Sequence, residues 1–270
     1  MTAHGMIAVL TYHSIAVETT GPFAHLTVDP GLFDEHLAAL REHGVDVIPF
    51  CDVPGALAAR RSAVTITIDD GLEDAADNAC PTLTRHGLPA TLFIPTAYVG
   101  ATSAWLPGDD AWRPMCSWDT LADIARGGFE IGSHGHMHLA ADINSPEVVH
   151  HDARVSRIAL EDHLGHGVAS FAYPFGYHGR PARAAVRAAG FAQACAVGDL
   201  PARAGDDRWA LPRLQVLNHT TPEALLELVA RRPARIARGW AHSKQTVWRA
   251  GRRWAGWGPT EAGRVRGAVG

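Results

Sequence analysis

Short apolar runs alternate with segments whose apolar residues recur at helical spacing, along most of this 270-residue chain. Runs such as 7–12 and 63–68 are rich in aliphatic and β-branched residues, which favours strands. Stripes such as Phe33, Leu37 and Leu40 have the spacing of one helix face. The alternation recurs about seven or eight times, which predicts parallel strands with helical crossovers in a closed barrel or a doubly wound sheet.

The boundaries of these elements follow from turn and cap residues. Asp29 before Pro30, and Thr221 before Pro222, are typical of helix starts. We expect strands over 7–12, 45–50, 63–68, 90–94, 129–133, 168–173, 191–197 and 214–217. We expect helices over 30–44, 53–61, 73–86, 118–126, 146–164 and 181–189, and from 222 onward.

Polar motifs stand where three of the expected strands end. Asp69-Asp70 follows the run 63–68, His134 follows 129–133, and Pro174-Phe-Gly176 closes the run 168–173. In a β/α barrel the carboxyl ends of all strands share one rim, where active sites are built. An open sheet brings fewer strand ends to one point, so the motifs favour the barrel.

The residue types at these strand ends suit a metal site. One carboxylate and two histidines four residues apart, His134 and His138, can supply three ligands and leave positions open, as in catalytic sites. The i,i+4 spacing predicts a helical turn that aims both rings at one point. Alone, Asp-Asp-Gly also suits an acidic turn, and the histidines suit a surface stretch. Their joint position at strand ends favours the site.

The motifs together resemble those of the polysaccharide deacetylase family, the NodB-like group known as carbohydrate esterase family 4. The resemblance spans roughly residues 6–225, and it rests on these segments: Leu10-Thr-Tyr-His-Ser-Ile15, Thr67-Ile-Asp-Asp-Gly71, Ala90-Thr-Leu-Phe-Ile-Pro95, Glu130-Ile-Gly-Ser-His-Gly-His-Met-His138 and Phe171-Ala-Tyr-Pro-Phe-Gly176. It implies an α/β fold, a distorted (β/α) barrel with about seven parallel strands, and metal-dependent hydrolysis of an amide or ester.

The resemblance also implies roles for individual residues. Asp69 matches the catalytic base, and the metal ligands match Asp70, His134 and His138. The third motif would place Tyr173, Pro174, Phe175 and Gly176 at the substrate, with the Phe175 N–H facing the oxyanion. Without the other motifs, Pro174-Phe-Gly176 would be read as a tight turn.

The chain departs from the family pattern at the partner of the base. Many members begin the third motif with an arginine that pairs with the base, and this chain has Ala172 there. We hypothesise that Arg213, in Leu211-Pro-Arg-Leu214, takes that place. The alternative is a surface arginine.

The proton donor to the leaving amine is open. Family members often use a histidine in a Leu-x-His motif, which Leu217-Asn-His219 fits. Two other histidines compete with His219. His13 ends the first strand and should lie on the active rim, whereas His136 should point off the ligand face.

The segment 97–117 is long for a loop, which suggests a lid or groove wall. Its aromatic residues Tyr98, Trp105 and Trp112 could stack on sugar rings, or they could pin the loop to the body of the protein.

Charge divides the chain into an expected barrel domain, 1–230, and a basic tail, 231–270, partly helical or disordered. The tail holds nine Arg and one Lys against one acid, for a net charge of +9, although the whole chain carries −4. Its tryptophans suit contact with an anionic membrane, and a frayed or partner-docked tail is the alternative. Charge alone would allow nucleic acid, but nothing else supports it, so none is expected.

Composition and leader signals bear on location. There is no charged-then-apolar leader and no run of 18 apolar residues, which predicts a cytoplasmic protein or one peripheral to the inner membrane face. The four cysteines, at 51, 80, 116 and 195, form no CxxC pair, so we expect reduced thiols.

We therefore expect a metal-dependent enzyme that removes an acetyl group from an N-acetylated sugar or glycan. Zn²⁺ suits the ligands best, with Co²⁺, Ni²⁺ or Fe²⁺ as alternatives. One rival is a hydrolase of another amide, such as a formamide or a cyclic imide. The other is an inactive carbohydrate-binding relative. The oligomeric state is not predicted.

Overall fold

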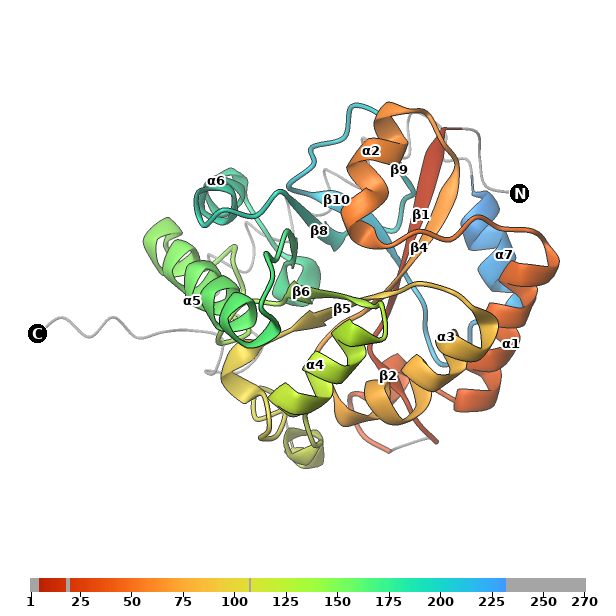
Figure 1. The fold of residues 1–270 in the computed structure, drawn as a ribbon, viewed down its shortest axis with the longest axis horizontal. Helices are drawn as coiled ribbons and strands as arrows, with labels where there is room; N and C mark the ends of the chain where they lie inside the picture. The colour runs from red at the N-terminus through yellow and green to blue at the C-terminus, as the bar shows by residue number, and fades with distance from the viewer. Residues whose placement is uncertain (1–4, 18–19, 107, 232–270) are drawn as a thin grey trace, which may run out of the picture.

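The protein was analysed as a computed structural model, which describes residues 5–17, 20–106 and 108–231. Seven parallel strands close into a barrel because the last pairs with the first (Figure 1). In spatial order these strands are β1 (Met6–Tyr12), β4 (Ala63–Ile68), β5 (Thr91–Ile94), β6 (Glu130–Ser133), β7 (Ser170–Ala172), β8 (Gln193–Val197) and β10 (Leu211–Gln215). The predicted fold class is confirmed.

Three short strands lie beside the barrel. The two-residue strand β9 (Ala202–Arg203) pairs antiparallel with β1, and β2 (Ser14–Ile15) pairs with β3 (Thr27–Val28) in a separate ribbon.

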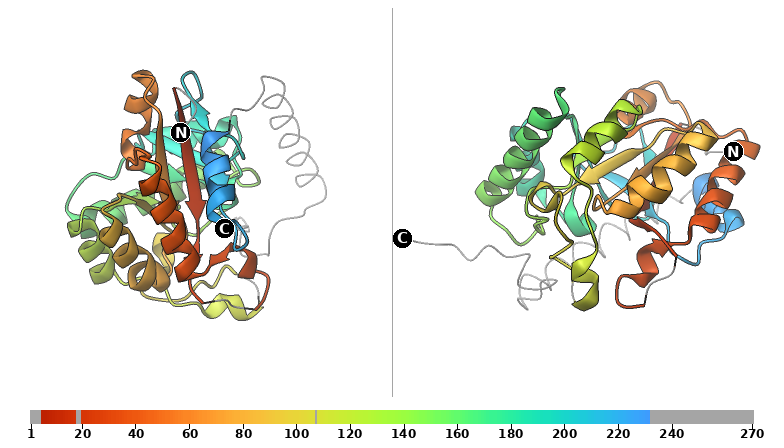
Figure 2. Two further views of the ribbon diagram at one scale, coloured as in Figure 1. Left: turned by 90° about the vertical axis from the view of Figure 1, so that its right-hand side faces the viewer. Right: turned by 60° about the horizontal axis from the view of Figure 1, so that its bottom comes forward.

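Helices surround the barrel, as Figures 1 and 2 show. They are α1 (Pro30–Glu42), α2 (Val53–Ala58), α3 (Cys80–His86), α4 (Trp118–Arg126), α5 (Pro146–Leu164), α6 (Arg180–Ala188) and α7 (Pro222–Ala230). A π-helical turn, Ala75–Ala79, leads into α3. The Asp29 carboxylate accepts from Gly31 N and Leu32 N, so the predicted cap of α1 is present.

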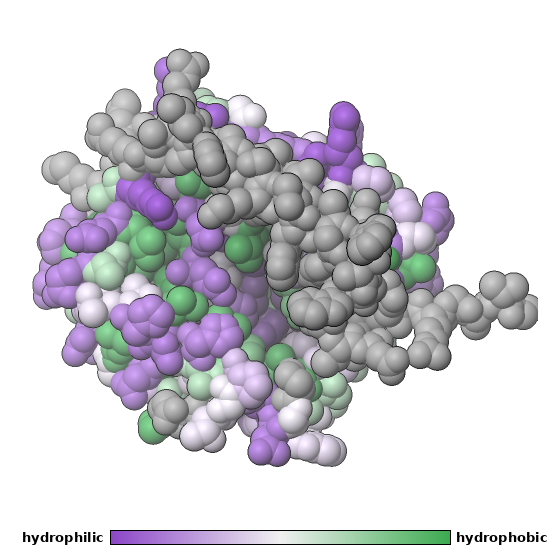
Figure 3. Space-filling view, turned by 180° about the vertical axis from the view of Figure 1, so that it is seen from behind, coloured by the Kyte–Doolittle hydropathy of each residue, from purple (hydrophilic) through white to green (hydrophobic). Residues whose placement is uncertain are grey.

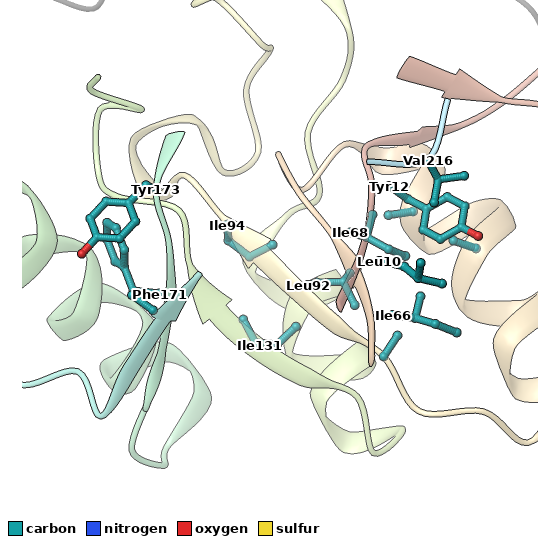
Figure 4. Packing of buried hydrophobic residues seen from close by; sticks show 14 of the residues in the cluster. Leu10, Tyr12, Ile66, Ile68, Leu92, Ile94, Ile131, Phe171, Tyr173 and Val216 are labelled. Atoms are coloured by element: carbon teal, nitrogen blue, oxygen red, sulfur yellow. The ribbon is translucent and has the colours of Figure 1, made fainter. Parts of the chain in front are cut away.

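The core divides along the two faces of each strand. Leu10, Ile66 and Leu92, from three neighbouring strands, belong to the main hydrophobic cluster between strands and helices (Figure 4). Because side chains alternate along a strand, Thr65 and Thr67 point away from that cluster, toward the barrel interior. Asp69 follows the last residue of β4, and by the same alternation its side chain lies on the interior face with Thr65 and Thr67.

The predicted strand over 45–50 was wrong. Only Val47 forms a bridge, to Val64, and the segment then enters a 3-10 turn, Phe50–Asp52. Pro49 has no N–H to extend the ladder. β5 pairs only with Thr67 and Ile68 of β4, so the first residues of β4 have no β5 partner on that side. The segment 45–50 lies there and bridges Val64.

The remaining expectations concern surface, thiols and tail. All four cysteines are free, and only Cys51 is exposed. No described helix has the length and apolar character needed to cross a bilayer. On the face in Figure 3, hydrophobic residues are interspersed among hydrophilic ones. Apart from Arg231, the expected tail 231–270 lies outside the described residues.

Candidate active site

Three potential metal ligands meet at the carboxyl ends of β4 and β6. Asp70 follows β4, and His134 and His138 follow β6, with ligand atoms all within 4.8 Å of one another. Asp70 Oδ1 lies 3.5 Å from His134 Nε2 and 3.3 Å from His138 Nε2. All three side chains are buried. The structure thus brings together the residues that the sequence predicted as ligands.

The segment from His134 to His138 is a loop, so the predicted helical turn was wrong. Gly135 has φ 77° and His138 has φ 52°, and these left-handed residues cannot continue a right-handed helix. The rings nevertheless meet, with centroids 4.9 Å apart.

The distances suit a small divalent ion. Asp70 Oδ1 lies within 3.5 Å of both Nε2 atoms, so the three residues would be able to share one ion. His134 Nδ1 donates to the Ala172 carbonyl at 2.8 Å, which leaves the Nε2 lone pair on the Asp70 side.

Protonation also suits metal binding. Burial lowers the pKa of His134 to about 4, so its imidazole is neutral at pH 7. Burial alone would raise the pKa of Asp70, but its hydrogen bond to His138 and the nearby histidine charges lower it below the usual range. A neutral imidazole and an ionised carboxylate are the forms that bind a cation.

Asp69 and Arg213 form a buried bidentate ion pair inside the barrel. Arg213 Nη1 and Nη2 donate to Asp69 Oδ1 and Oδ2, both at 2.6 Å, and Nη1 also reaches Thr67 Oγ1 at 3.2 Å. Arg213 lies in the middle of β10 with only 1% of its surface exposed, so the surface alternative was wrong.

The ion pair controls the charge of Asp69. Burial would raise the pKa of this carboxyl, but the Arg213 guanidinium and His134 lower it more, so it lies below its usual value. Asp69 therefore stays ionised at neutral pH.

The Asp69 and Asp70 carboxylates open into one pocket of about 370 Å³. Its lining consists of His13, Phe23, His25, Leu26, Asp69, Asp70, Trp105, Leu106, His134, His138, Phe175, Gly176, Tyr177, Val197, Arg213 and Gln215.

The third motif contributes two of its four predicted residues to this pocket. Phe175 and Gly176 line it, with φ values of 59° and 69°. The Phe175 ring packs against His138 at 4.7 Å between centroids. Tyr173 is buried in the core, where its hydroxyl donates to Trp209 O, and Pro174 begins the 3-10 turn Pro174–Gly176. Tyr173 and Pro174 are not among the lining residues.

The histidines named as proton donors lie in different places. His13 lines the pocket, and its buried Nδ1 has no hydrogen-bond partner among the described residues. Burial lowers the pKa of His13, against the opposing charges of Asp70 and Asp69. His219 is exposed beside Asn218, and His136 Nδ1 lies 2.9 Å from Thr96 Oγ1; neither lines the pocket.

Sequence reasoning missed His25, which does line the pocket. Its Nδ1 donates a hydrogen bond to Pro22 O at 2.7 Å, so Nε2 is the ring nitrogen that this bond leaves unused. His25 belongs to a 3-10 turn, Ala24–Leu26, rather than to a strand end, so no motif marked it.

The loop 97–117 forms one wall of the pocket. Trp105 is buried and stacks on His138, with centroids 4.7 Å apart and ring planes 28° apart. Asp110 ties this loop to the opposite segment, accepting from Phe23 N at 3.0 Å and pairing with Arg113. Trp105 therefore both lines the pocket and pins the loop, whereas Trp112 is 76% exposed and does not line the pocket.

Comparison with known proteins identifies the family. The family model named Polysaccharide deacetylase matches residues 57–194, about half of the chain. This chain belongs to the polysaccharide deacetylase family. YxkH of Bacillus subtilis (strain 168), which carries the same family name, is 22% identical over 214 residues, covering 78% of this chain and 71% of that protein.

Solved structures share the fold. The deacetylase PplD of Streptococcus pyogenes, in complex with acetate, superposes with a TM-score of 0.73 at 24% identity, covering 85% of this chain and 100% of that one. IcaB from Ammonifex degensii gives a TM-score of 0.69 at 21% identity, covering 89% of this chain and 98% of that one. At these identities the likeness concerns the barrel architecture.

Proposed function

We propose that this chain hydrolyses the N-acetyl groups of a glycan with the help of one divalent metal ion. The proposal rests chiefly on one observation: Asp70, His134 and His138 converge in a single pocket beside Asp69, an ionised carboxylate outside the ligand set. Family membership supplies the sugar-polymer substrate class. The similar deacetylase PplD was solved in complex with acetate, which supports acetyl as the group removed.

In this proposal Asp70, His134 and His138 hold the ion. When bound there, it would polarise the amide carbonyl and increase the acidity of a water molecule. Asp69 accepts the proton of the attacking water, because Arg213 keeps its carboxylate ionised and oriented. The donor set suits Zn²⁺ best, and Co²⁺, Ni²⁺ or Fe²⁺ are alternatives.

Two further groups complete the chemistry. The backbone N–H of Phe175, in a left-handed turn at the pocket wall, is assigned to the developing oxyanion. The leaving amine needs a proton, and we assign its delivery to His25. His25 lines the pocket, unlike His219, and burial lowers the pKa of His13, which lines the same pocket.

An acetate-release screen tests the proposal. Purified, zinc-loaded protein would be incubated with N-acetylated monosaccharides, nucleotide sugars and oligosaccharides, and acetate and free amine would be measured together. Equal amounts of acetate and amine are expected from at least one glycan. A different acid would favour the rival amide hydrolase. Release of no acid from any substrate would favour the inactive carbohydrate binder. The intact Asp69–Arg213 pair argues against that rival.

The domain division, location and tail remain proposals. We propose that 1–230 is the catalytic domain of a cytoplasmic protein and that the tail 231–270 contacts the inner membrane face. The tail's charge of +9 supports this contact. A protein truncated after residue 232 that pellets with anionic vesicles as well as the full chain would contradict it.

A further inference from the structure

The loop between the two histidine ligands is held by helix α5. Asp152, on the buried face of α5, accepts two backbone hydrogen bonds: Oδ2 from His136 N at 2.9 Å and Oδ1 from Met137 N at 2.7 Å. Both oxygens of one carboxylate are thus used on consecutive peptide groups, midway between His134 and His138.

A second support comes from the next turn of the same helix. Ser156 Oγ lies 2.7 Å from Ser133 Oγ, which accepts the N–H of Gly135 at 3.0 Å. Three consecutive N–H groups of the loop are therefore hydrogen-bonded. Asp152 of α5 accepts two of them directly, and Ser156 of α5 contacts the serine that accepts the third.

The loop lies directly against the carboxylate. A Cβ built on Gly135 would come within 2.5 Å of Asp152 Oδ2, and Gly135 has φ 77°. Glycine is therefore required here both for its conformation and for the approach of Asp152.

His138 depends on this support more than His134 does. A metal-binding histidine usually donates its other ring nitrogen to a fixed acceptor, as His134 does to Ala172 O. The Nδ1 of His138 is buried and has no such partner among the described residues. Its φ of 52° is unfavourable for a non-glycine residue, so its place depends on the loop backbone and on the stacked Trp105 ring.

We propose that Asp152 is a positioning residue that acts through the loop backbone to hold His138 where it can bind the metal. This rests on the proposed metal-dependent function. Asp152 does for His138, by way of two peptide groups, what the Ala172 carbonyl does for His134 directly.

The variant Asp152→Asn tests the proposal. The amide has one acceptor oxygen, and its NH₂ group would face the second N–H of the loop. Asp162→Asn is the matched control, because it makes the same change on an exposed position of the same helix. Zinc affinity would be measured on metal-free proteins by competition with a chromophoric chelator, well below their thermal midpoints.

We expect D152N to weaken zinc binding about 10-fold or more, the usual range for a group that orients a ligand, with D162N unchanged. If D152N does not fold, Asp152→Glu replaces it, because the longer side chain keeps the charge but displaces both acceptor oxygens, and a loss of about 10-fold is again expected. A D152N protein with wild-type zinc affinity, whatever its thermal midpoint, would overturn the inference, as would unchanged affinity in D152E in the second case. A wild-type protein that binds no zinc would instead overturn the proposed function.

Discussion

Replacing Arg213 by methionine should destabilise the protein strongly at neutral pH. The Arg213–Asp69 pair is bidentate, and both side chains are almost fully buried. Removing one partner of a buried ion pair leaves the other charge uncompensated, at a cost of about 3–5 kcal/mol. A methionine keeps most of the packing volume, so the loss reports charge rather than a cavity.

The loss should depend on pH in a definite direction. In the wild type, Arg213 depresses the pKa of Asp69, so the pair stabilises the protein above the unfolded carboxyl pKa and ceases to do so as pH falls through the folded one. In R213M, burial is no longer opposed by the guanidinium, so the pKa of Asp69 rises above its unfolded value. Each unit of rise costs about 1.4 kcal/mol at neutral pH, and this penalty fades toward pH 4 as the carboxyl protonates.

Urea unfolding of EDTA-treated proteins at pH 7 and pH 4.5 measures this effect. The wild type should exceed R213M by several kcal/mol at pH 7 and by less at pH 4.5. The double variant R213M/D69N has no buried charge at the pair and should recover most of the loss. An R213M protein within 1 kcal/mol of the wild type at pH 7, or a difference independent of pH, would refute the reasoning.

Three further predictions follow from the pocket. In R213M the acidic limb of the pH profile of kcat/KM should move to higher pH, because the raised pKa of Asp69 leaves less of this base ionised. An unmoved limb would argue against control of Asp69 by Arg213. His25→Gln should lower kcat about 10²–10⁴-fold at unchanged metal content, with His219→Gln near wild type, and the reverse order would move the proton donor to His219. Gly176→Ala should cost about 2 kcal/mol or more in urea unfolding, because its Cβ would lie 2.4 Å from Val197, and wild-type stability would show that the turn can shift.

Strand ends were the most predictable part of the site. The apolar run 63–68 ends at Asp69-Asp70, and a barrel brings the carboxyl ends of its strands to one rim. Local sequence and topology together therefore predicted where the two carboxylates and His134 lie. The caps at Asp29 and Thr221 were equally local, since each depends on residues within one turn.

Features that depend on packing between distant segments were less predictable. The run 45–50 has the composition of a strand, yet it makes one bridge to β4 and then turns at Pro49 into the 3-10 turn Phe50–Asp52. His25 reaches the pocket from a 3-10 turn that carries no motif. The sequence could suggest Arg213 as the partner of the base, but only closure of β10 against β1 and β8 shows that it lies inside the barrel.

The most direct test of the account measures metal content and turnover on the same samples. Wild-type protein, the metal-free form and Asp70→Asn would be assayed for bound divalent ions and for acetate release. The account predicts one ion per chain in the wild type, loss of activity on chelation, recovery on adding back one equivalent of zinc, and weak metal binding without turnover in D70N. Full acetate release by the metal-free protein, or a full equivalent of tightly bound ion in D70N, would contradict it.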